Sequence, residues 1–236
     1  MLQLAVTTFL TQNAGMIPIA RNGYFITGSD TNVGKTYIAC QLIRQLTALD
    51  KPVEVRKPVE SGCDTDERGR LIAADARLLN RANHFRHSME IIAPNRFQAA
   101  LAPHRAARLQ GTAVYLSDLI AACQLVQAEH LLIVEGAGGF YSPLAEDGLN
   151  ADLASALKLP VLIVVNDRIG AVNQALMTID AVENRDLPIA AIILNQADPD
   201  HPIGMDNQAD LTQYCGYPIF QCCYQQSLPN LFDHQA

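Results

Sequence analysis

The sequence has 236 residues, of which 49% are hydrophobic, so it can bury a large core as a single α/β domain. Only 17% of the residues are charged, the formal net charge is −7, and no run of Lys or Arg stands out. These properties argue against electrostatic binding to nucleic acid. An acidic chain that bound a polyanion would need to concentrate its positive charge locally.

The N-terminal stretch differs from the rest of the chain. Residues 2–10 are mostly apolar, but this run is shorter than the roughly 20 residues of a membrane-spanning helix, and no basic residue precedes it as in a signal peptide. Met16 is an alternative start. We therefore expect residues 1–22 to be a loosely attached extension, residues 23–236 to form a single domain, and the protein to be cytoplasmic without membrane contact.

The six cysteines show no CxxC pair and no Cys/His spacing typical of a metal site. Most of them lie within apolar stretches, which predicts reduced thiols in or near the core. A disulfide between the adjacent Cys222 and Cys223 would be strained, and the sequence leaves a redox role for this pair open.

Short β-branched runs alternate with longer helical stretches. In chain order, the patterns predict a strand at 24–27, a helix at 34–49, a strand at 53–56, helices at 71–81 and 116–129, a strand at 131–134 followed by a loop at 136–143, a strand at 161–165, a helix at 171–183, a strand at 189–194 and a short helix at 208–214. Continuous apolar strands indicate burial on both faces, and alternation with helices indicates parallel strands. The predicted fold is α/β: a doubly wound, mostly parallel sheet with helices on both faces, which binds ligands beyond the carboxyl ends of its strands.

The segment GSDTNVGKT, residues 28–36, lies between a predicted strand and a predicted helix, as a phosphate-binding loop requires. Gly34 would let the backbone approach phosphates closely, and the amides at the helix start favour an anion. Lys35 would place its charge on the β- and γ-phosphates, and Thr36 would offer a hydroxyl to Mg²⁺. The general G-x-x-x-x-G-K-[ST] pattern requires its first glycine at position 29, where this chain has Ser29, and the glycine Gly28 lies one residue earlier. The alternative is a glycine turn before an ordinary helix.

A phosphate-binding loop of this kind requires a second acidic group for Mg²⁺, commonly at the end of another strand. Glu135 follows four apolar residues and precedes a glycine-rich run, so it should emerge at the carboxyl end of a buried strand. A carboxylate there is costly unless a cation lies near it; a solvated glutamate is the alternative. Asp75, among apolar neighbours on a predicted helix, is a second candidate that the pattern alone does not separate from a surface aspartate.

A second lysine, Lys57, follows the predicted strand at 53–56 and precedes a proline, which favours extended backbone. It should therefore project at the carboxyl edge of the sheet, near the phosphate-binding loop. Two lysines at one phosphate site suggest transfer of the γ-phosphate. Ser61 could donate a hydrogen bond to a bound oxyanion. A surface lysine without a role is the alternative interpretation of Lys57.

Taken together, these segments resemble the dethiobiotin synthetase family. The motifs GSDTNVGKT, RKPVESG, AAD, FQAALAPH, IVEGAGG and LPVLIVV occur in that family's order and spacing between about Gly23 and Asn195. The resemblance implies a P-loop NTPase-like α/β fold and a homodimer with the active site near the dimer interface. It also implies an ATP- and Mg²⁺-dependent cyclo-ligase of biotin biosynthesis. The expected reaction converts 7,8-diaminononanoate and CO₂ into dethiobiotin, ADP and phosphate through a carbamic–phosphoric anhydride.

The resemblance also implies roles for individual residues, in four groups. The catalytic residues would be Lys35 and Lys57. The Mg²⁺ ligands would be Thr36, Asp75 and Glu135. The substrate would contact Ser61, Lys57 and Asn173. The nucleotide would be bound by Asn32, Val33, Gly34, Lys35, Thr36, Tyr37, Asp75, Glu135, Gly136, Ala137, Gly138, Asn195 and Gln196, with Asn195 recognising adenine.

Two segments depart from the family pattern. Residues 166–174, where the family holds the substrate's carboxyl tail, lack the usual Asn-His pair, and residues 221–236 lack the usual adenine loop. Substrate affinity and nucleotide preference therefore stay open. The alternative functions are a catalytically weakened paralogue, a nucleotide-dependent switch ATPase and a cobyrinate-type amide-forming ligase. Asp30, where such switches usually carry lysine, argues against the switch, and the chain is too short for the ligase's glutamine-hydrolysing domain.

Overall fold

The computed structural model describes residues 15–200 and 202–232. Its centre is a parallel six-stranded sheet with the strand order β10-β9-β8-β1-β7-β2. These strands are β1 (Gly23–Gly28), β2 (Val53–Arg56), β7 (Leu131–Gly139), β8 (Val161–Asn166), β9 (Ile189–Asn195) and β10 (Ile219–Cys222). The predicted doubly wound, parallel α/β fold is confirmed.

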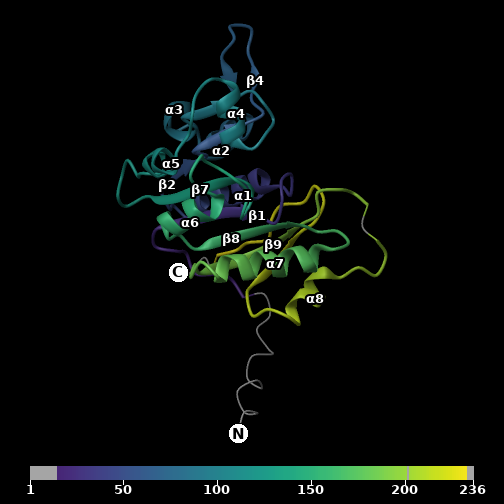
Figure 1. The fold of residues 1–236 in the computed structure, drawn as a ribbon. Coiled ribbons are helices and arrows are strands. Elements are labelled where there is room, and N and C mark those ends of the chain that lie inside the picture. The colour runs from purple at the N-terminus through teal and green to yellow at the C-terminus, as the bar shows by residue number, and fades with distance from the viewer. Residues whose placement is uncertain (1–14, 201, 233–236) are drawn as a thin grey trace.

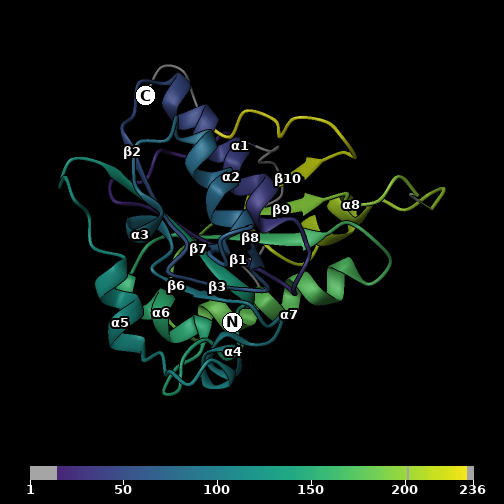
Figure 2. The ribbon, with the colours of Figure 1, turned by 90° about the horizontal axis from the view of Figure 1, so that it is seen from above.

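Helices cover both faces of this sheet. Figure 2 shows α1 and α2 on one side of the central strands and α6 and α7 on the other. The helices are α1 (Lys35–Ala48), α2 (Ala74–Ala82), α3 (Met89–Ile92), α4 (Pro103–Leu109), α5 (Leu116–Ala122), α6 (Asn150–Leu157), α7 (Ala171–Glu183) and α8 (Asn207–Thr212). Among the described residues, no helix has the length and apolar character needed to cross a membrane.

The alternation of side chains along each strand divides the core into two layers. Tyr24 and Ile26 of β1 belong to the layer under α1, whereas Phe25 belongs to the layer under α6 and α7. All three side chains are completely buried, as expected for a parallel sheet that is covered on both faces. The carboxyl ends of the strands, where the chain leaves these layers, are consequently the places at which polar side chains can gather.

Four short strands lie outside the central sheet and were not expected from the sequence. Strand β3 (Val59–Ser61) pairs in parallel with β6 (Asn95–Phe97), and β4 (Asp64–Thr65) forms a hairpin with β5 (Leu71–Ile72). Together with α3 and α4, they extend beyond the β2 edge of the sheet, at the top of Figure 1. Strands β3, β4 and β5 lie between β2 and α2 in the chain, so this region positions the residues that follow β2.

Several predicted boundaries are wrong. The helix expected at 71–81 begins only at Ala74, because residues 71–72 pair in the β4–β5 hairpin. The helix expected at 116–129 ends at Ala122. The loop expected at 136–143 starts late, because β7 continues to Gly139, and β10 was missed altogether. The other predicted strands and helices are present within a few residues of their expected limits.

Residues 15–22 of the expected loose extension are in contact with the domain, whereas residues 1–14 lie outside the described part. The side chain of Ile17 is only 4% exposed, and its backbone amide donates a hydrogen bond of 2.7 Å to the carbonyl of Leu231. The Tyr24 hydroxyl accepts from the amide of Ala20 and donates to the carbonyl of Pro18. The packed domain therefore begins before residue 23.

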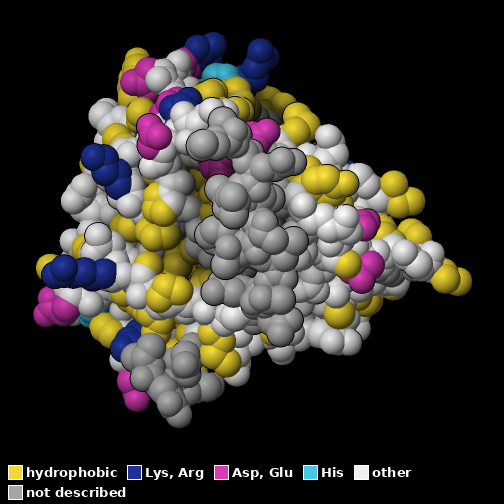
Figure 3. Space-filling model, turned by 90° about the horizontal axis from the view of Figure 1, so that it is seen from below, with side chains coloured by type: hydrophobic (Ala, Val, Ile, Leu, Met, Phe, Trp, Pro, Cys, Tyr) yellow, Lys and Arg dark blue, Asp and Glu magenta, His cyan; other side chains and the backbone are white. Residues whose placement is uncertain are grey.

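The surface view in Figure 3 shows how charge is distributed over one face of the molecule. Lys and Arg side chains lie there in separate small groups among acidic, hydrophobic and other side chains. Binding to a nucleic-acid backbone relies on basic side chains gathered along one surface. The arrangement on this face agrees with the low charge of the sequence.

Candidate active site

The loop between β1 and α1 has the conformation of an anion cradle. Gly34 adopts φ +91°, and a Cβ atom added to it would lie 2.1 Å from Nδ2 of Asn195. Glycine is therefore required both for the backbone angle and for the close approach of Asn195, whose Nδ2 donates to the carbonyl of Val33 at 2.9 Å. Helix α1 begins at Lys35 without a side-chain cap, so the amides of its first turn remain available to an anion.

A cavity of about 390 Å³ lies above this loop, at the carboxyl ends of β1, β2 and β7. Its lining comes from the loop, from the segment after β2, from the first turn of α2 and from the end of β7. The lining residues are Thr31, Asn32, Gly34, Lys35, Thr36, Lys57, Glu60, Ser61, Asp75, Glu135, Ala137 and Gly138. Ten of these were predicted to bind nucleotide, metal or substrate, and the fold thus brings them together from four separate segments.

Lys57 lies at the centre of this group. Its Nζ is 2.5 Å from Oε1 of Glu135, 3.1 Å from the carbonyl oxygen of Gly136 and 3.4 Å from Oδ2 of Asp75. The side chain of Lys57 is 4% exposed and that of Glu135 is 1% exposed, so neither residue is the solvated surface group that the sequence left open. Burial alone would lower the pKa of Lys57, but the carboxylates of Glu135 and Asp75 raise it overall. Lys57 is therefore a fixed positive charge in this cavity.

Thr36, Asp75 and Glu135 offer oxygen atoms suited to a hard divalent cation. The hydroxyl of Thr36 donates to Oε1 of Glu135 at 2.9 Å, while Oε2 of Glu135 is buried without a hydrogen-bond partner. Within the described ranges, no group of three or more His, Cys, Asp or Glu side chains is arranged to hold a metal. Mg²⁺ usually binds one or two carboxylates and completes its shell with water and substrate phosphates, and Asp75 and Glu135 offer two carboxylates at the cavity. The residues present fit this ion.

Lys35 is the second positive charge in the cavity. Its Nζ donates to the carbonyl oxygen of Asp30 in its own loop at 2.9 Å. Burial, and to a smaller extent the neighbouring Lys57, lower the pKa of Lys35 to about 8. A phosphate in the loop would give this ammonium a charged acceptor, which forms a stronger hydrogen bond than a carbonyl oxygen does.

Several predicted site residues do not line the cavity. Tyr37 donates its hydroxyl to the carbonyl of Gln226 at 2.7 Å, and Gln196 accepts from the amide of Tyr224 at 3.3 Å. Both contacts join these two residues to the segment after β10. Asn173 lies exposed on α7, where its Nδ2 is 3.5 Å from the sulfur of Met177. Within one chain, Asn173 is therefore not part of the cavity.

Val33 and Gly136, two further predicted nucleotide contacts, use their backbone carbonyls in the folded chain. The carbonyl of Val33 holds Asn195, and the carbonyl of Gly136 accepts from Lys57. Asn195 is thus placed against the phosphate loop, where its amide group is already bonded to the loop backbone. Ser61 lies in the cavity lining and donates its hydroxyl to the carbonyl of Leu101 at 2.7 Å.

Two lining residues, Thr31 and Glu60, were not singled out from the sequence. Thr31 belongs to the phosphate loop itself, so its place in the motif could have indicated it. Glu60 is 6% exposed and belongs to the unpredicted strand β3, three residues after Lys57. A buried glutamate in a cavity that already contains two carboxylates cannot be foreseen without knowing which segments meet.

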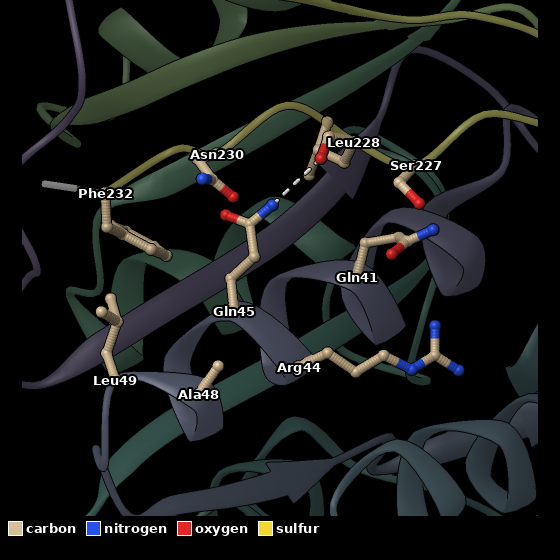
Figure 4. A pocket seen from close by; sticks show the side chains of 9 residues that line it. All are labelled: Gln41, Arg44, Gln45, Ala48, Leu49, Ser227, Leu228, Asn230 and Phe232. Atoms are coloured by element: carbon tan, nitrogen blue, oxygen red, sulfur yellow. Dashed lines mark hydrogen bonds between the residues drawn. The ribbon is translucent and has the colours of Figure 1, made fainter. Parts of the chain in front are cut away.

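A second, smaller cavity of about 220 Å³ lies between α1 and residues 227–232. Figure 4 shows the glutamine side chains Gln41 and Gln45 of α1 facing this C-terminal segment, with Arg44 directed outward from the helix. The lining of this cavity includes none of the residues described above. Its contacts therefore belong to the packing of the C-terminal segment.

Comparisons with known proteins agree with this geometry. A protein-family model described as an AAA domain matches residues 22–228. The ATP-dependent dethiobiotin synthetase BioD of Vesicomyosocius okutanii subsp. Calyptogena okutanii is 44% identical over 192 residues, which cover 81% of this chain and 85% of the relative. The chain belongs to the dethiobiotin synthetase family. The family member BioD of Anaeromyxobacter dehalogenans is 41% identical over 193 residues, 81% of this chain and 84% of the relative.

Solved structures confirm the fold class of this synthetase family member. The signal recognition particle receptor FtsY from Elizabethkingia anophelis aligns with a TM-score of 0.52 and 15% identity. The match covers 92% of this chain and 63% of the receptor chain. At this level of identity, the likeness shows a shared P-loop α/β fold, and the chemistry of the two proteins has to be argued separately.

Proposed function

We propose that this chain is an ATP-dependent dethiobiotin synthetase, as its relatives are named, and that it acts on 7,8-diaminononanoate and CO₂ in biotin biosynthesis. The observation that carries the proposal is the meeting of Lys57, Glu135 and the phosphate loop in one cavity. A second buried ammonium beside a triphosphate-binding loop suits a further anion next to the γ-phosphate. The carbamate of this reaction is such an anion.

The chain supplies the charges that bring the two anions together. Lys35 and the amides of the first turn of α1 would bind the β- and γ-phosphates of ATP. Thr36, Asp75 and Glu135 would hold Mg²⁺, which would neutralise part of the negative charge of the phosphates. The ammonium of Lys57, held by Glu135 and Gly136, would face the carbamate and the transferring phosphoryl group.

The reaction then follows in three steps. One amine of the substrate attacks CO₂, loses a proton and becomes a carbamate. A carbamate oxygen attacks the γ-phosphorus of ATP, the bond to ADP breaks, and a carbamic–phosphoric anhydride forms. The second amine attacks the carbonyl carbon of this anhydride, loses its proton and expels phosphate, which closes the cyclic urea. Lys57 and Lys35 would stabilise the negative charge in both later steps, and Ser61 would donate a hydrogen bond to the substrate.

The proposal includes a homodimer that works in the cytoplasm, with the active site near the dimer interface. Asn173 lies exposed on α7, and the side chains of Ile169 and Met177 beside it are 73% and 65% exposed. Large apolar side chains exposed together favour an interface with a second chain. A second copy packed on α7 would let Asn173 reach the substrate of its partner, which it does not reach within one chain.

A coupled assay tests the proposed function. The purified protein is mixed with ATP, Mg²⁺, bicarbonate and 7,8-diaminononanoate, and dethiobiotin and ADP are measured by mass spectrometry. We expect equal amounts of the two products and no ADP formation without the diamine. ATP hydrolysis that does not depend on the diamine would instead favour a switch ATPase. Product at a trace rate with intact nucleotide binding would favour a weakened paralogue.

A further inference from the structure

Helix α2, which carries Asp75, has no local cap at its N-terminus. The N-cap residue is Ala73, whose side chain cannot accept a hydrogen bond, and no side-chain cap is made by the N-cap residue. The first amides of a helix have no partner within the helix, and Ser, Thr, Asp or Asn usually satisfies one of them. In this chain, the acceptor comes from another part of the fold.

Glu60 of strand β3 caps this helix from outside. Its Oε1 accepts from the amide of Asp75 at 2.9 Å, and its Oε2 accepts from the amide of Ala76 at 3.0 Å. The side chain of Glu60 is almost fully buried, and a carboxylate at this end of a helix also interacts favourably with the helix dipole. Both carboxylate oxygens are therefore used to attach the start of α2 to β3.

This attachment determines where Asp75 lies relative to Lys57. Lys57 and Glu60 are three residues apart in the segment that follows β2, and Glu60 binds the backbone of Asp75 directly. The Asp75 side chain is 42% exposed and makes a 3.4 Å contact with Nζ of Lys57, so packing alone does not hold it. The contacts from Glu60 tether the backbone of Asp75 and Ala76, and so help to hold Asp75 beside Lys57.

We propose that Glu60 is a positioning residue, which holds the α2 N-terminus so that the carboxylate of Asp75 faces the reaction centre. This inference rests on the proposed function, in which Asp75 is a ligand of Mg²⁺. Residues that orient a metal ligand typically change metal affinity or activity by about 10- to 100-fold when they are replaced. Glu60 belongs to this class by its contacts with the backbone of Asp75.

The test begins with Glu60→Ala and Glu60→Gln. We expect Glu60→Ala to lower kcat about 10- to 100-fold and to weaken Mg·ATP binding, measured by calorimetry, while the KM for the diamine changes less. Glu60→Gln keeps the shape and one acceptor oxygen, so its effects should be smaller. In both variants, amide hydrogen exchange at residues 75 and 76 should be faster than in the wild type. A folded Glu60→Ala protein with wild-type kcat and Mg·ATP affinity would overturn the inference; if that variant fails to fold, Glu60→Gln decides by the same criteria.

Asp206→Ala is the matched control, because Asp206 caps α8 through a hydrogen bond from the amide of Ala209 and is not part of the cavity lining. It should change kcat less than about twofold, as expected for a surface cap that touches no reactant. An equal loss of activity in Asp206→Ala and Glu60→Ala would show a general effect of lost helix capping and would overturn the positioning role.

A double-mutant cycle separates action through Asp75 from any direct role. In an Asp75→Asn background, Glu60→Ala should cause little further loss of kcat, because residues that act through one another are not additive. An undiminished effect in that background would refute the inference. Amide hydrogen exchange and Mg·ATP affinity can be measured without turnover, so they test the role of Glu60 even if the wild-type protein makes no dethiobiotin. A wild-type protein without dethiobiotin formation would count against the proposed function and not against the role of Glu60.

Discussion

Lys57 and Glu135 form a buried ion pair. Lys57 follows β2, and Glu135 lies within the neighbouring strand β7. Each charge would be costly to bury alone, so removing either member of the pair should destabilise the fold. The same ammonium is assigned to the reaction in the proposed function. Removing it should therefore affect folding and catalysis together, and the two effects have to be separated by experiment.

We expect Lys57→Ala to lower kcat by about 10²- to 10³-fold, the usual loss when one group that stabilises developing negative charge is removed. The variant should also lose about 3–5 kcal/mol of stability, because Glu135 is left as an unpaired buried charge. The double variant Lys57→Ala/Glu135→Gln should recover part of that stability in urea unfolding but none of the turnover. Near-normal dethiobiotin formation by Lys57→Ala would refute the assigned role.

At the scale of elements, strand β2 shows why α5 ends early. Arg56 donates to the carbonyls of Ala122 and Gln124, and Glu54 accepts from the amides of Val126 and Gln127. These two buried side chains thus bind backbone carbonyl and amide groups of residues 122–127. In a continued helix, the same groups would form hydrogen bonds within the helix. The apolar pattern of residues 116–129 is compatible with a helix, but it contains no sign of this competing partner.

The pKa of Glu54 offers a test of this contact. Burial would raise it, but the amides of Val126 and Gln127 and the guanidinium of Arg56 lower it overall, below 4.5. A depressed carboxyl pKa contributes stability that is present above the unfolded-state value and is lost as the pH falls through the folded-state value. Glu54→Gln should therefore be less stable than the wild type by about 3–5 kcal/mol at pH 7, because Arg56 loses its buried partner.

The difference between the wild type and Glu54→Gln should shrink as the pH is lowered below 4.5. Urea unfolding at a series of pH values measures this difference. His130 also faces Glu54, with Nδ1 3.3 Å from Oε1, so His130→Ala in both backgrounds is the control for this contact. A difference that stays constant down to the acid limit would show that the ionised carboxylate is not the origin of the stability.

At the scale of the whole molecule, the two ends of the described chain are packed together behind helix α1. The amide group of Gln45 binds the carbonyls of Leu228 and Pro229 and the amide of Leu231, and part of this contact is visible in Figure 4. The rings of Tyr24 and Phe232 lie 6.0 Å apart. The C-terminal segment thus covers the helix that begins with the phosphate loop and links it to β1.

Phe232→Ala tests how much this covering contributes. Phe232 is 1% exposed, so its truncation should cost about 3–5 kcal/mol in urea unfolding. The cavity that contains Lys57 does not include this side chain, so kcat should stay close to that of the wild type below the unfolding range. Tyr214→Ala, at a side chain that is 67% exposed, is the control and should change stability by less than about 0.5 kcal/mol. Equal stability of the two variants would contradict the proposed covering role.

Local sequence patterns predict much of the fold and most of the candidate residues of the active site. The apolar runs of β7 and β8, the glycine-containing loop before Lys35 and the position of Glu135 directly after the apolar run of β7 are local patterns. They could be predicted because strand burial and loop conformation depend on neighbouring residues, and parallel strands present their carboxyl ends at one edge. The short strands β3 and β6 carry too few residues for such a pattern.

Contacts between distant segments had to come from the folded chain. Lys57 and Glu135 are 78 positions apart, and Glu60 binds an amide 15 positions away. The attachment of Ile17 to Leu231 likewise joins opposite ends of the described chain. From the sequence, one can infer only that a buried charge or an uncapped helix needs some partner, because an unpaired buried group is costly. Which residue meets that requirement depends on how the strands and helices pack, and local sequence does not encode this.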